Sequence, residues 1–278
     1  MQQLAPSCQP QRGYLWIAKE HPCLPIRPCS FPTVRPARNF LQSFSKHENK
    51  PDAIILVSAH FEAGGVAIEA DRHPQTVHDF GGFAPELYQI NYPAPGNPAL
   101  AERLAVVLRN AGLAAGLVHG HGFDHGAWVP LSLMYPEADI PVVMVSVDPH
   151  AGPQHHFDLG RAMAPLRREN IQIIGSGSMT HNLQQAFAAM RCGERHAPMP
   201  QWVSQFVDWF DQAFAAGDIE TLLNYRKNAP NAVRNHPTEE HLMPLFAALG
   251  AAGDKWTASK LHGSSDFGVL SMDAYAFG

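Results

Sequence analysis

The sequence predicts a three-layer α/β domain in which helices flank a central sheet that is largely parallel or mixed. Short runs rich in β-branched residues alternate with stretches of helical spacing, a pattern typical of strand–helix–strand units. No internal repeat appears, and no change in composition divides the chain. Its 278 residues, 45% of them hydrophobic, suffice for one sizeable core. We therefore expect a single domain.

The N-terminal region differs from the rest of the chain in composition. Residues 1–13 are rich in Gln and Pro, and a second Pro-rich stretch covers residues 22–36. Such composition favours extended or irregular chain. We expect an irregular or disordered segment over residues 1–13 and the domain itself over residues 14–278.

The regular pattern begins near residue 51. Residues 53–57 form an apolar run that predicts a buried strand, and residues 66–70 predict another. Over residues 98–111, aliphatic side chains recur at helical spacing, and Gly112 marks the helix end. Residues 114–118 predict a short strand. The aliphatic residues of the helix are Leu100, Leu104, Val107 and Leu108.

The second half of the chain continues the alternation. Residues 140–147 predict a strand, residues 151–168 contain a helix, and residues 171–174 predict the next strand. Residues 202–216 predict an amphipathic helix. Its apolar stripe consists of Val203, Phe206, Val207, Phe210 and Phe214.

The last elements are a helix over residues 239–249, which Gly250 is expected to stop, and a strand over residues 268–272. In open α/β sheets, ligands bind beyond the carboxyl ends of the strands. The residues that follow the predicted strands are therefore the first candidates for a functional site.

Composition excludes several classes of partner. The formal net charge is −5 and no run of Lys or Arg forms a basic patch, so we do not expect nucleic-acid binding. Apolar runs such as residues 140–146 are far shorter than the roughly 20 residues of a membrane-spanning helix. The first thirteen residues lack the basic and apolar segments of a secretory signal. We therefore expect a cytoplasmic protein without a membrane partner.

Histidine is unusually frequent, with 16 residues against 20 Lys plus Arg. His60 follows the predicted strand 53–57, and His181 follows the strand and small residues of segment 171–178. Imidazole is the commonest metal ligand in proteins and also transfers protons near neutral pH. Histidines at the rim of a sheet therefore predict a metal site.

Two further histidines are candidates for this site. Thr238 is expected to cap the helix that starts there, which places His241 in its first turn. The helix dipole disfavours a protonated imidazole at that position, so His241 would stay neutral and able to bind metal. His125 lies in a predicted loop between Asp124 and Trp128, which could orient its ring or a substrate.

The other histidines receive no role in the site. We make no metal assignment for His78 and His150. Structural roles are expected for His47, His73, His119, His121, His155, His156, His196 and His262.

A set of short motifs occurs in a fixed order between about Asp52 and Gly278. Each motif is weak alone, but the ordered set is highly specific. The motifs are Val57-Ser58-Ala59-His60, His78-Asp79-Phe80-Gly81-Gly82-Phe83, Tyr92-Pro93-Ala94-Pro95-Gly96, Phe123-Asp124-His125-Gly126-Ala127-Trp128, Met134-Tyr135-Pro136, Gly175-Ser176-Gly177, His181-Asn182-Leu183, Pro237-Thr238-Glu239-Glu240-His241 and Leu270-Ser271-Met272-Asp273-Ala274-Tyr275. With this set the chain resembles the DOPA-dioxygenase type of class III extradiol ring-cleavage dioxygenases, which is related to protocatechuate dioxygenase catalytic subunits.

The resemblance implies a mononuclear non-heme site that works with iron(II) and that zinc can also occupy. It implies that His60 and His241 are metal ligands and that His181 is either a further ligand or the acid/base beside the metal. It also implies that His125 contacts the substrate and assists proton transfer. The substrate would be a small catechol, DOPA-like in type, whose ring opens with O2. Residues 14–278 would then form the catalytic domain.

The chain departs from the family in one loop. Members usually carry a Ser-His-Gly-x-Pro segment after the first strand, and its histidine is a metal ligand. Anchoring on Leu15-Trp16-Ile17 and Pro22 places Lys19 where this histidine should be, and His21 lies two residues later. His21 is the candidate to replace the missing ligand after a local shift. Otherwise the site has one ligand fewer.

Two other functions remain open from the sequence. The same histidines could bind zinc and activate water in a hydrolase, although no carboxylate stands out as the general base. The altered loop would also suit a non-catalytic binding protein on the same fold. Asp79, Asp124 and Asn182 are candidates to support the ligands from behind. The particular catechol, the cleavage position and the choice between monomer and homo-oligomer are left open.

Overall fold

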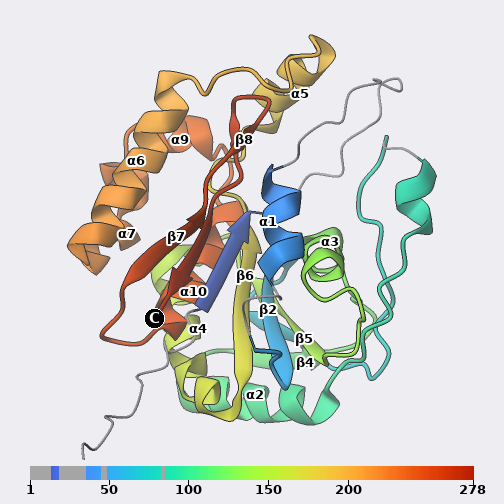
Figure 1. Cartoon of the computed structure of the whole chain (residues 1–278). Helices are drawn as coiled ribbons and strands as arrows, with labels where there is room; N and C mark the ends of the chain where they lie inside the picture. The colour runs from blue at the N-terminus through green and yellow to red at the C-terminus, as the bar shows by residue number, and fades with distance from the viewer. Residues whose placement is uncertain (1–13, 19–35, 45–48, 83–84) are drawn as a thin grey trace, which may run out of the picture.

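The computed structural model of the chain describes residues 14–18, 36–44, 49–82 and 85–278. Within these residues, eight strands form one sheet in the order β4–β3–β5–β2–β6–β1–β10–β7 (Figure 1). Strands β8 and β9 pair with each other in a separate hairpin. The strands are β1 (Tyr14–Ala18), β2 (Ala53–Glu62), β3 (Val66–Glu69), β4 (Ala115–Val118), β5 (Val142–Val147), β6 (Ile171–Gly177), β7 (Ala258–His262), β8 (Ser265–Asp266), β9 (Leu270–Ser271) and β10 (Ala274–Phe277).

The centre of the sheet is parallel. Strand β2 pairs in parallel with β5 and β6, and β6 pairs in parallel with β1. Antiparallel pairs flank this centre, because β10 runs against β1 and β7 and β3 runs against β5. Strands β2, β5 and β6 are buried along most of their length, as expected for strands covered on both faces. The predicted α/β class with a largely parallel, mixed sheet is confirmed.

Helices cover the sheet on both faces, which makes three layers (Figure 1). Side chains alternate along β2, so Ile55 and Val57 join one apolar core while Ile54 and Leu56 join the other. The first core is covered by α2 (Pro98–Asn110), α4 (Gly152–Met163) and α10 (Met243–Ala251), and the second by α1 (Pro36–Phe44) and α3 (His125–Met134).

The remaining helical elements extend these layers. The predicted amphipathic helix is α6, and its apolar stripe is buried as expected. Among the described residues, no helix is both long enough and apolar enough to cross a membrane. The elements are α5 (Leu183–Arg191), α6 (Gln201–Ala216), α7 (Ile219–Leu223), α8 (Tyr225–Asn228), α9 (Ala232–Asn235) and the 3₁₀ turns η1 (Pro85–Gln89), η2 (Ala164–Glu169) and η3 (Glu240–Leu242).

Two predicted helices are each divided in the structure. The helix expected within residues 151–168 becomes α4 followed by η2, and the helix expected over residues 239–249 becomes η3 followed by α10. In both cases the second piece has a proline near its start, Pro165 in η2 and Pro244 in α10. Proline lacks a backbone N–H and therefore suits the first turn of a helix but not its interior.

The strand predicted over residues 268–272 is wrong in extent. Only Leu270 and Ser271 form a strand, β9. Phe267 and Gly268 have φ angles of 53° and 68°, so the backbone turns there instead of continuing an extended strand. The last strand of the main sheet is β10, which had not been predicted.

Candidate metal and substrate site

The candidate site lies where β2 and β6 approach their carboxyl ends. Ser58 of β2 is paired with Ser176 of β6 in the parallel register. His60 lies two residues beyond Ser58, and His181 follows the end of β6 at Gly177. The turn η3, which carries His241, packs against both strands. The structure therefore brings three of the predicted histidines to one edge of the sheet.

Two glycines permit this close packing. A Cβ atom on Gly177 would lie 2.1 Å from the carbonyl oxygen of His241. A Cβ atom on Gly126, in α3, would lie 2.6 Å from Ser58 Oγ and 3.3 Å from His60 Cδ2. Any larger residue at either position would push η3 or α3 away from the strands. The glycines thus set the distances between the elements that carry the histidines.

His60 and His241 face each other, although 181 positions separate them in the chain. Their Nε2 atoms are 3.3 Å apart, and their ring planes are nearly perpendicular at 86°. His241 is buried and His60 is partly buried. Two of the residues proposed as metal ligands therefore point at the same small volume.

Each of these two histidines has a carboxylate behind it. Nδ1 of His60 lies 3.2 Å from Asp79 Oδ2, and Nδ1 of His241 lies 2.7 Å from Glu240 Oε1. A histidine that donates from Nδ1 to a carboxylate has a fixed ring orientation and, in its neutral form, an unprotonated Nε2. Both Nε2 atoms then present lone pairs toward each other.

This donor set fits a metal ion. Two lone pairs that face each other at 3.3 Å repel unless a cation lies close to both or one ring carries a proton on Nε2 and donates it to the other. Nitrogen ligands that lie about 2.1 Å from one ion are roughly 3.0–3.4 Å apart when the angle between them is between right-angled and tetrahedral. The spacing of the two Nε2 atoms falls in that range.

The role of Glu240 was missed from the sequence. Glu240 was interpreted as a residue at the start of a helix, with Thr238 as the cap. In the structure, Glu239 occupies the N-cap of η3 without a side-chain cap bond, so the prediction for Thr238 is wrong. The Thr238 hydroxyl instead donates to Glu240 Oε1 at 3.0 Å. The only sequence signal was that Glu240 directly precedes His241.

His181 lies against the ring of His241. The two imidazoles stack with centroids 3.4 Å apart and an interplanar angle of 14°. The backbone N–H of His181 donates to the carbonyl of Asn235 at 2.8 Å, which ties this segment to the region before η3. His181, Glu240 and His241 each offer a ligand atom within 4.8 Å of the others. Both roles expected for His181, ligand or acid/base, are compatible with this placement.

His125 lies on the other side of His60. It is the first residue of α3 and not a loop residue as predicted, because Asp124 Oδ1 caps this helix by accepting the N–H of Ala127 at 3.2 Å. The ring centroids of His125 and His60 are 3.9 Å apart. We call the resulting series the histidine cluster. Its members are His125, His60, His241 and His181.

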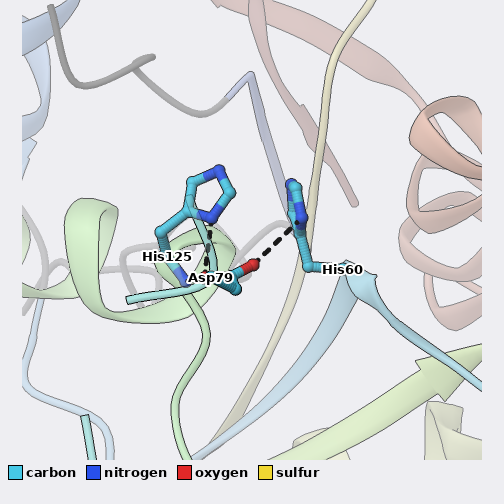
Figure 2. Close-up of side chains that lie close together, drawn as sticks. All are labelled: His60, Asp79 and His125. Atoms are coloured by element: carbon cyan, nitrogen blue, oxygen red, sulfur yellow. Dashed lines mark hydrogen bonds and ion pairs between the residues drawn. The ribbon is translucent and has the colours of Figure 1, made fainter. Parts of the chain in front are cut away.

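Asp79 joins His60 to His125, as Figure 2 shows. Its Oδ1 lies 2.8 Å from His125 Nδ1 and also accepts the backbone N–H of His125 at 2.8 Å. Burial alone would raise the pKa of Asp79, but the hydrogen bonds from His125 and His60 hold the pKa of this carboxyl well below its usual range. Asp79 is therefore ionised at neutral pH and can accept a hydrogen bond from each ring.

The other two expected supporting residues act at a distance from the rings. Asp124 is buried, and its Oδ1 accepts the hydroxyl of Ser58 at 2.8 Å, while Ser58 Oγ accepts the backbone N–H of His60 at 3.2 Å. The side chain of Asn182 caps α5 and donates to the carbonyl of Arg234. These residues hold the backbone of the site. The contribution of Ser58 was not predicted.

Two residues of the altered loop, Lys19 and His21, lie outside the described residues. Strand β1 ends at Ala18, which pairs in parallel with Gly177 of β6. The chain therefore leaves β1 at the same edge of the sheet as the histidine cluster.

A further group of acidic residues and a histidine lies at the end of β3. Glu69 accepts the backbone N–H groups of His121 and Gly122 at 2.7 and 3.3 Å. Asp71 accepts the backbone N–H of Gly120 at 2.8 Å and pairs with His119. These carboxylates fasten the loop that leads to Asp124 and His125. This arrangement agrees with the structural roles expected for His119 and His121.

Comparison with known proteins gives consistent matches. The sequence profile of the family described as the catalytic LigB subunit of aromatic ring-opening dioxygenase matches residues 32–277. The 4,5-DOPA dioxygenase extradiol of Beta vulgaris is 41% identical over 246 residues, which cover 87% of this chain and 90% of the relative. The protein of the same name from Escherichia coli K12 is 40% identical over 205 residues, which cover 73% of each chain.

A solved structure supports the same relationship. An uncharacterized protein from Escherichia coli K12 is similar to this chain with a TM-score of 0.73 and 29% identity, over 96% of this chain and 100% of that one. The profile match over most of the chain, and relatives about 40% identical over at least 73% of it, show the family. This chain belongs to the family of the catalytic LigB subunit of aromatic ring-opening dioxygenases.

Proposed function

We propose that this protein is an extradiol dioxygenase that opens the ring of a catechol with O2. The observation that carries the proposal is the convergence of His60 Nε2 and His241 Nε2, each ring backed by a carboxylate. Relatives named 4,5-DOPA dioxygenase extradiol support a DOPA-like catechol as the substrate. In the net reaction the ring bond beside the diol breaks and both atoms of O2 enter the product. No other oxidant or reductant is needed.

Iron(II) is the proposed cofactor, and zinc suits the same imidazole donors. His60 and His241 would hold the ion, with His181 or His21 as a further ligand. When bound, the ion would lower the pKa of the catechol hydroxyls and supply the redox chemistry with O2 that side chains lack. Asp79 and Glu240 would keep the two ligand rings in orientation.

His181 is proposed as the general acid/base. Its ring is buried and stacked on His241, so an acidic catechol hydroxyl in the site would lie within its reach. A neutral imidazole there accepts the second catechol proton and returns a proton as the ring opens.

His125 is proposed to hold the substrate. Its Nδ1 faces Asp79 at 2.8 Å, and the tautomer that carries its proton on Nδ1 would accept a hydrogen bond from a catechol hydroxyl at Nε2. The ring of Phe80 meets His125 edge to face, with centroids 5.5 Å apart, and Phe80 also packs against Trp128. These aromatic rings offer an apolar surface suited to a planar substrate.

The proposal extends to organisation and partners. We propose that residues 14–278 form the catalytic domain; residues 1–13, for which an irregular segment was expected, lie outside the described residues. The partners would be the small aromatic diol and O2, without nucleic acid or membrane, in a cytoplasmic monomer or homo-oligomer.

Anaerobic loading of the apoprotein with iron(II), followed by O2 uptake with a panel of catechols, tests this function. We expect one O2 consumed per catechol. His60→Ala and His241→Ala should abolish turnover, because each removes a ligand. His150→Ala, which removes an exposed histidine outside the cluster, should leave turnover unchanged. Full activity in either cluster variant would refute the ligand assignment.

The same preparations separate the rival functions. Zinc binding with ester or amide hydrolysis would favour a hydrolase, and a wild-type protein that takes up no metal would favour a binding protein. The variant His21→Ala tests the altered loop. We expect weaker iron binding and lower turnover if His21 completes the ligand set, whereas wild-type iron affinity in His21→Ala would exclude it.

A further inference from the structure

The feature that goes furthest beyond the family resemblance is the position of Asp79. Its carboxylate lies between two imidazoles that come from different elements, His60 in β2 and His125 in α3 (Figure 2). Oδ2 faces His60 Nδ1 at 3.2 Å, and Oδ1 faces His125 Nδ1 at 2.8 Å. One side chain therefore contacts both a proposed metal ligand and the proposed substrate-binding residue.

The two oxygens of Asp79 have different contacts. Oδ1 accepts the backbone N–H of His125 at 2.8 Å and also lies 2.8 Å from His125 Nδ1. Oδ2 lies 3.2 Å from His60 Nδ1. The carboxylate that supports His241 differs, because Glu240 lies 2.7 Å from the Nδ1 atom of one ligand ring and accepts the Thr238 hydroxyl. The chain thus allows a comparison between Asp79, which lies between two imidazole rings, and Glu240, which supports one ligand ring.

Asp79 is held in place by its neighbours. The indole Nε1 of Trp128 donates to the carbonyl of Val77 at 3.0 Å, which fixes the chain two residues before Asp79. On the other side, Phe80 packs edge to face on His125. The Asp79 side chain is only 25% exposed. The carboxylate is therefore preorganised by α3, the helix that also carries His125.

We propose that Asp79 is a positioning residue that serves both halves of the site, one oxygen orienting the metal ligand His60 and the other orienting the substrate-binding residue His125. The catechol part of this inference rests on the proposed function. The part that concerns His60 rests on metal binding alone.

The alternative interpretation of this geometry is that a metal ion binds between Asp79, His60 and His125, because their ligand atoms all lie within 4.8 Å of one another. Two features favour hydrogen bonds. Oδ1 already accepts the backbone N–H of His125, and Nε2 of His60 faces His241. The count of bound metal ions decides between the two readings.

Two substitutions separate the two roles of Asp79. In Asp79→Asn the single amide oxygen is expected to stay with the two donors of His125, and the amide NH₂ then faces His60 and cannot accept its proton. In Asp79→Ala both contacts are lost. Glu240→Ala is the matched control for a carboxylate that supports one ring, and Asp208→Asn, on an exposed part of α6, is the control for the loss of a carboxylate elsewhere.

The first measurement is titration of the apoprotein with cobalt(II), followed by visible absorption, which requires no turnover. We expect one equivalent to bind to the wild type. Asp79→Asn, Asp79→Ala and Glu240→Ala should each weaken cobalt binding by roughly 10- to 100-fold, the usual effect of losing a carboxylate behind a histidine ligand. Asp208→Asn should bind as the wild type does. Wild-type affinity in both Asp79 variants, or two equivalents in the wild type and one in Asp79→Ala, would overturn the proposal.

The second measurement concerns His125. At saturating iron(II), the KM for a catechol should rise about tenfold in Asp79→Ala, as expected for one misplaced hydrogen bond. It should stay near the wild-type value in Asp79→Asn and Glu240→Ala. Imidazole ¹⁵N spectra of the apoprotein provide a readout without turnover: the proton on His125 Nδ1 should persist in Asp79→Asn and be lost in Asp79→Ala. An unchanged His125 spectrum in Asp79→Ala would overturn the proposal that Asp79 orients His125.

The two proposals fail separately in these experiments. If the wild type consumes no O2 with any catechol while cobalt binding and the ¹⁵N spectra change as expected, the positioning role stands and the proposed function is rejected. If turnover is present while cobalt affinity and the His125 spectrum are unaffected by Asp79→Ala, the positioning role is rejected and the proposed function stands.

Discussion

At the scale of single residues, the site is made of pairs rather than of isolated histidines. His60 is paired with Asp79, and His241 is paired with Glu240. In each pair the carboxylate fixes which ring nitrogen carries the proton, so the other nitrogen is available to an ion. Whether such a ring can act as a metal ligand thus depends on the carboxylate beside it as well as on the histidine.

His181 is the residue whose two candidate roles can be told apart by one variant. His181→Ala is expected to lower kcat by roughly two or more orders of magnitude, as the loss of a positioned acid/base does. Iron content measured on the same sample separates the roles: retained iron with a lost rate supports acid/base action, and lost iron supports a ligand. A near-normal rate would remove His181 from the mechanism.

The sequence predicted the histidines of the cluster and offered Asp79 and Asp124 as supporting residues, but it did not show which side chains each of them contacts. His60 and His181 were predicted because each follows an apolar run, and a sequence shows such positions directly. The partner of His125 is Asp79, 46 positions away, and the hydroxyl of Ser58 meets Asp124 across 66 positions. Contacts of this kind depend on how helices and strands pack, and no local pattern encodes them.

At the scale of elements, α4 and α10 pack through two glycines. A Cβ atom on Gly160 would lie 2.0 Å from the carbonyl oxygen of Ala247, and a Cβ atom on Gly250 would lie 2.0 Å from that of Phe157. Gly250 lies inside α10, so its predicted role as the stop signal of that helix is wrong. Because Gly250 has no side chain, the backbone of α4 can lie close to α10 at this position.

Gly250→Ala is therefore expected to destabilise the protein. The helices must separate to relieve the overlap, which should lower the free energy of unfolding by about 1–3 kcal/mol or more. Urea unfolding measures the change. Gly116→Ala is the matched control, because a Cβ atom there would meet nothing within 4 Å. Equal stability of the two variants would show that α4 and α10 adjust without cost.

The elements that the sequence predicted are those with a strong one-dimensional pattern. The parallel strands β2, β5 and β6 are continuous apolar runs, and α6 has a clear apolar stripe. Helix α3 was not predicted, because it is buried on nearly all sides and contains Pro130, so it has no polar face to reveal helical spacing. Strand β7 was not predicted because its side chains are mostly exposed.

At the scale of the whole molecule, the histidines have two different uses. The histidine cluster lies at the carboxyl edge of the sheet, whereas His156 and His236 are buried and bonded to backbone. Nδ1 of His156 donates to the carbonyl of Gly152 at 2.7 Å, and its Nε2 accepts the N–H of Asp148 at 3.1 Å. His236 Nε2 donates to the carbonyl of Met179 at 2.8 Å. Burial lowers the pKa of each to about 4 from the ordinary 6.5.

These pKa values make the fold sensitive to acid in a defined window. Well above pH 6.5 both rings are neutral in the folded and in the unfolded chain. Between pH 6.5 and about 4 the unfolded chain binds protons that the folded protein does not, so the free energy of unfolding falls as the pH falls. Each histidine should contribute about 3 kcal/mol to this loss by pH 4.

His156→Gln isolates one of the two contributions from the carboxylates that also titrate in acid. At pH 7.5 this variant should be less stable than the wild type, because it loses the bonds to Gly152 and Asp148. At pH 4.5 the difference in the free energy of unfolding should be smaller by about 2–3 kcal/mol, since only the wild type is penalised there for keeping a neutral ring. Urea unfolding at both pH values measures the difference, with the exposed His150→Gln as the control. A difference that stays constant with pH would mean that His156 is protonated in the folded protein, and the acid sensitivity would then have to come from other groups.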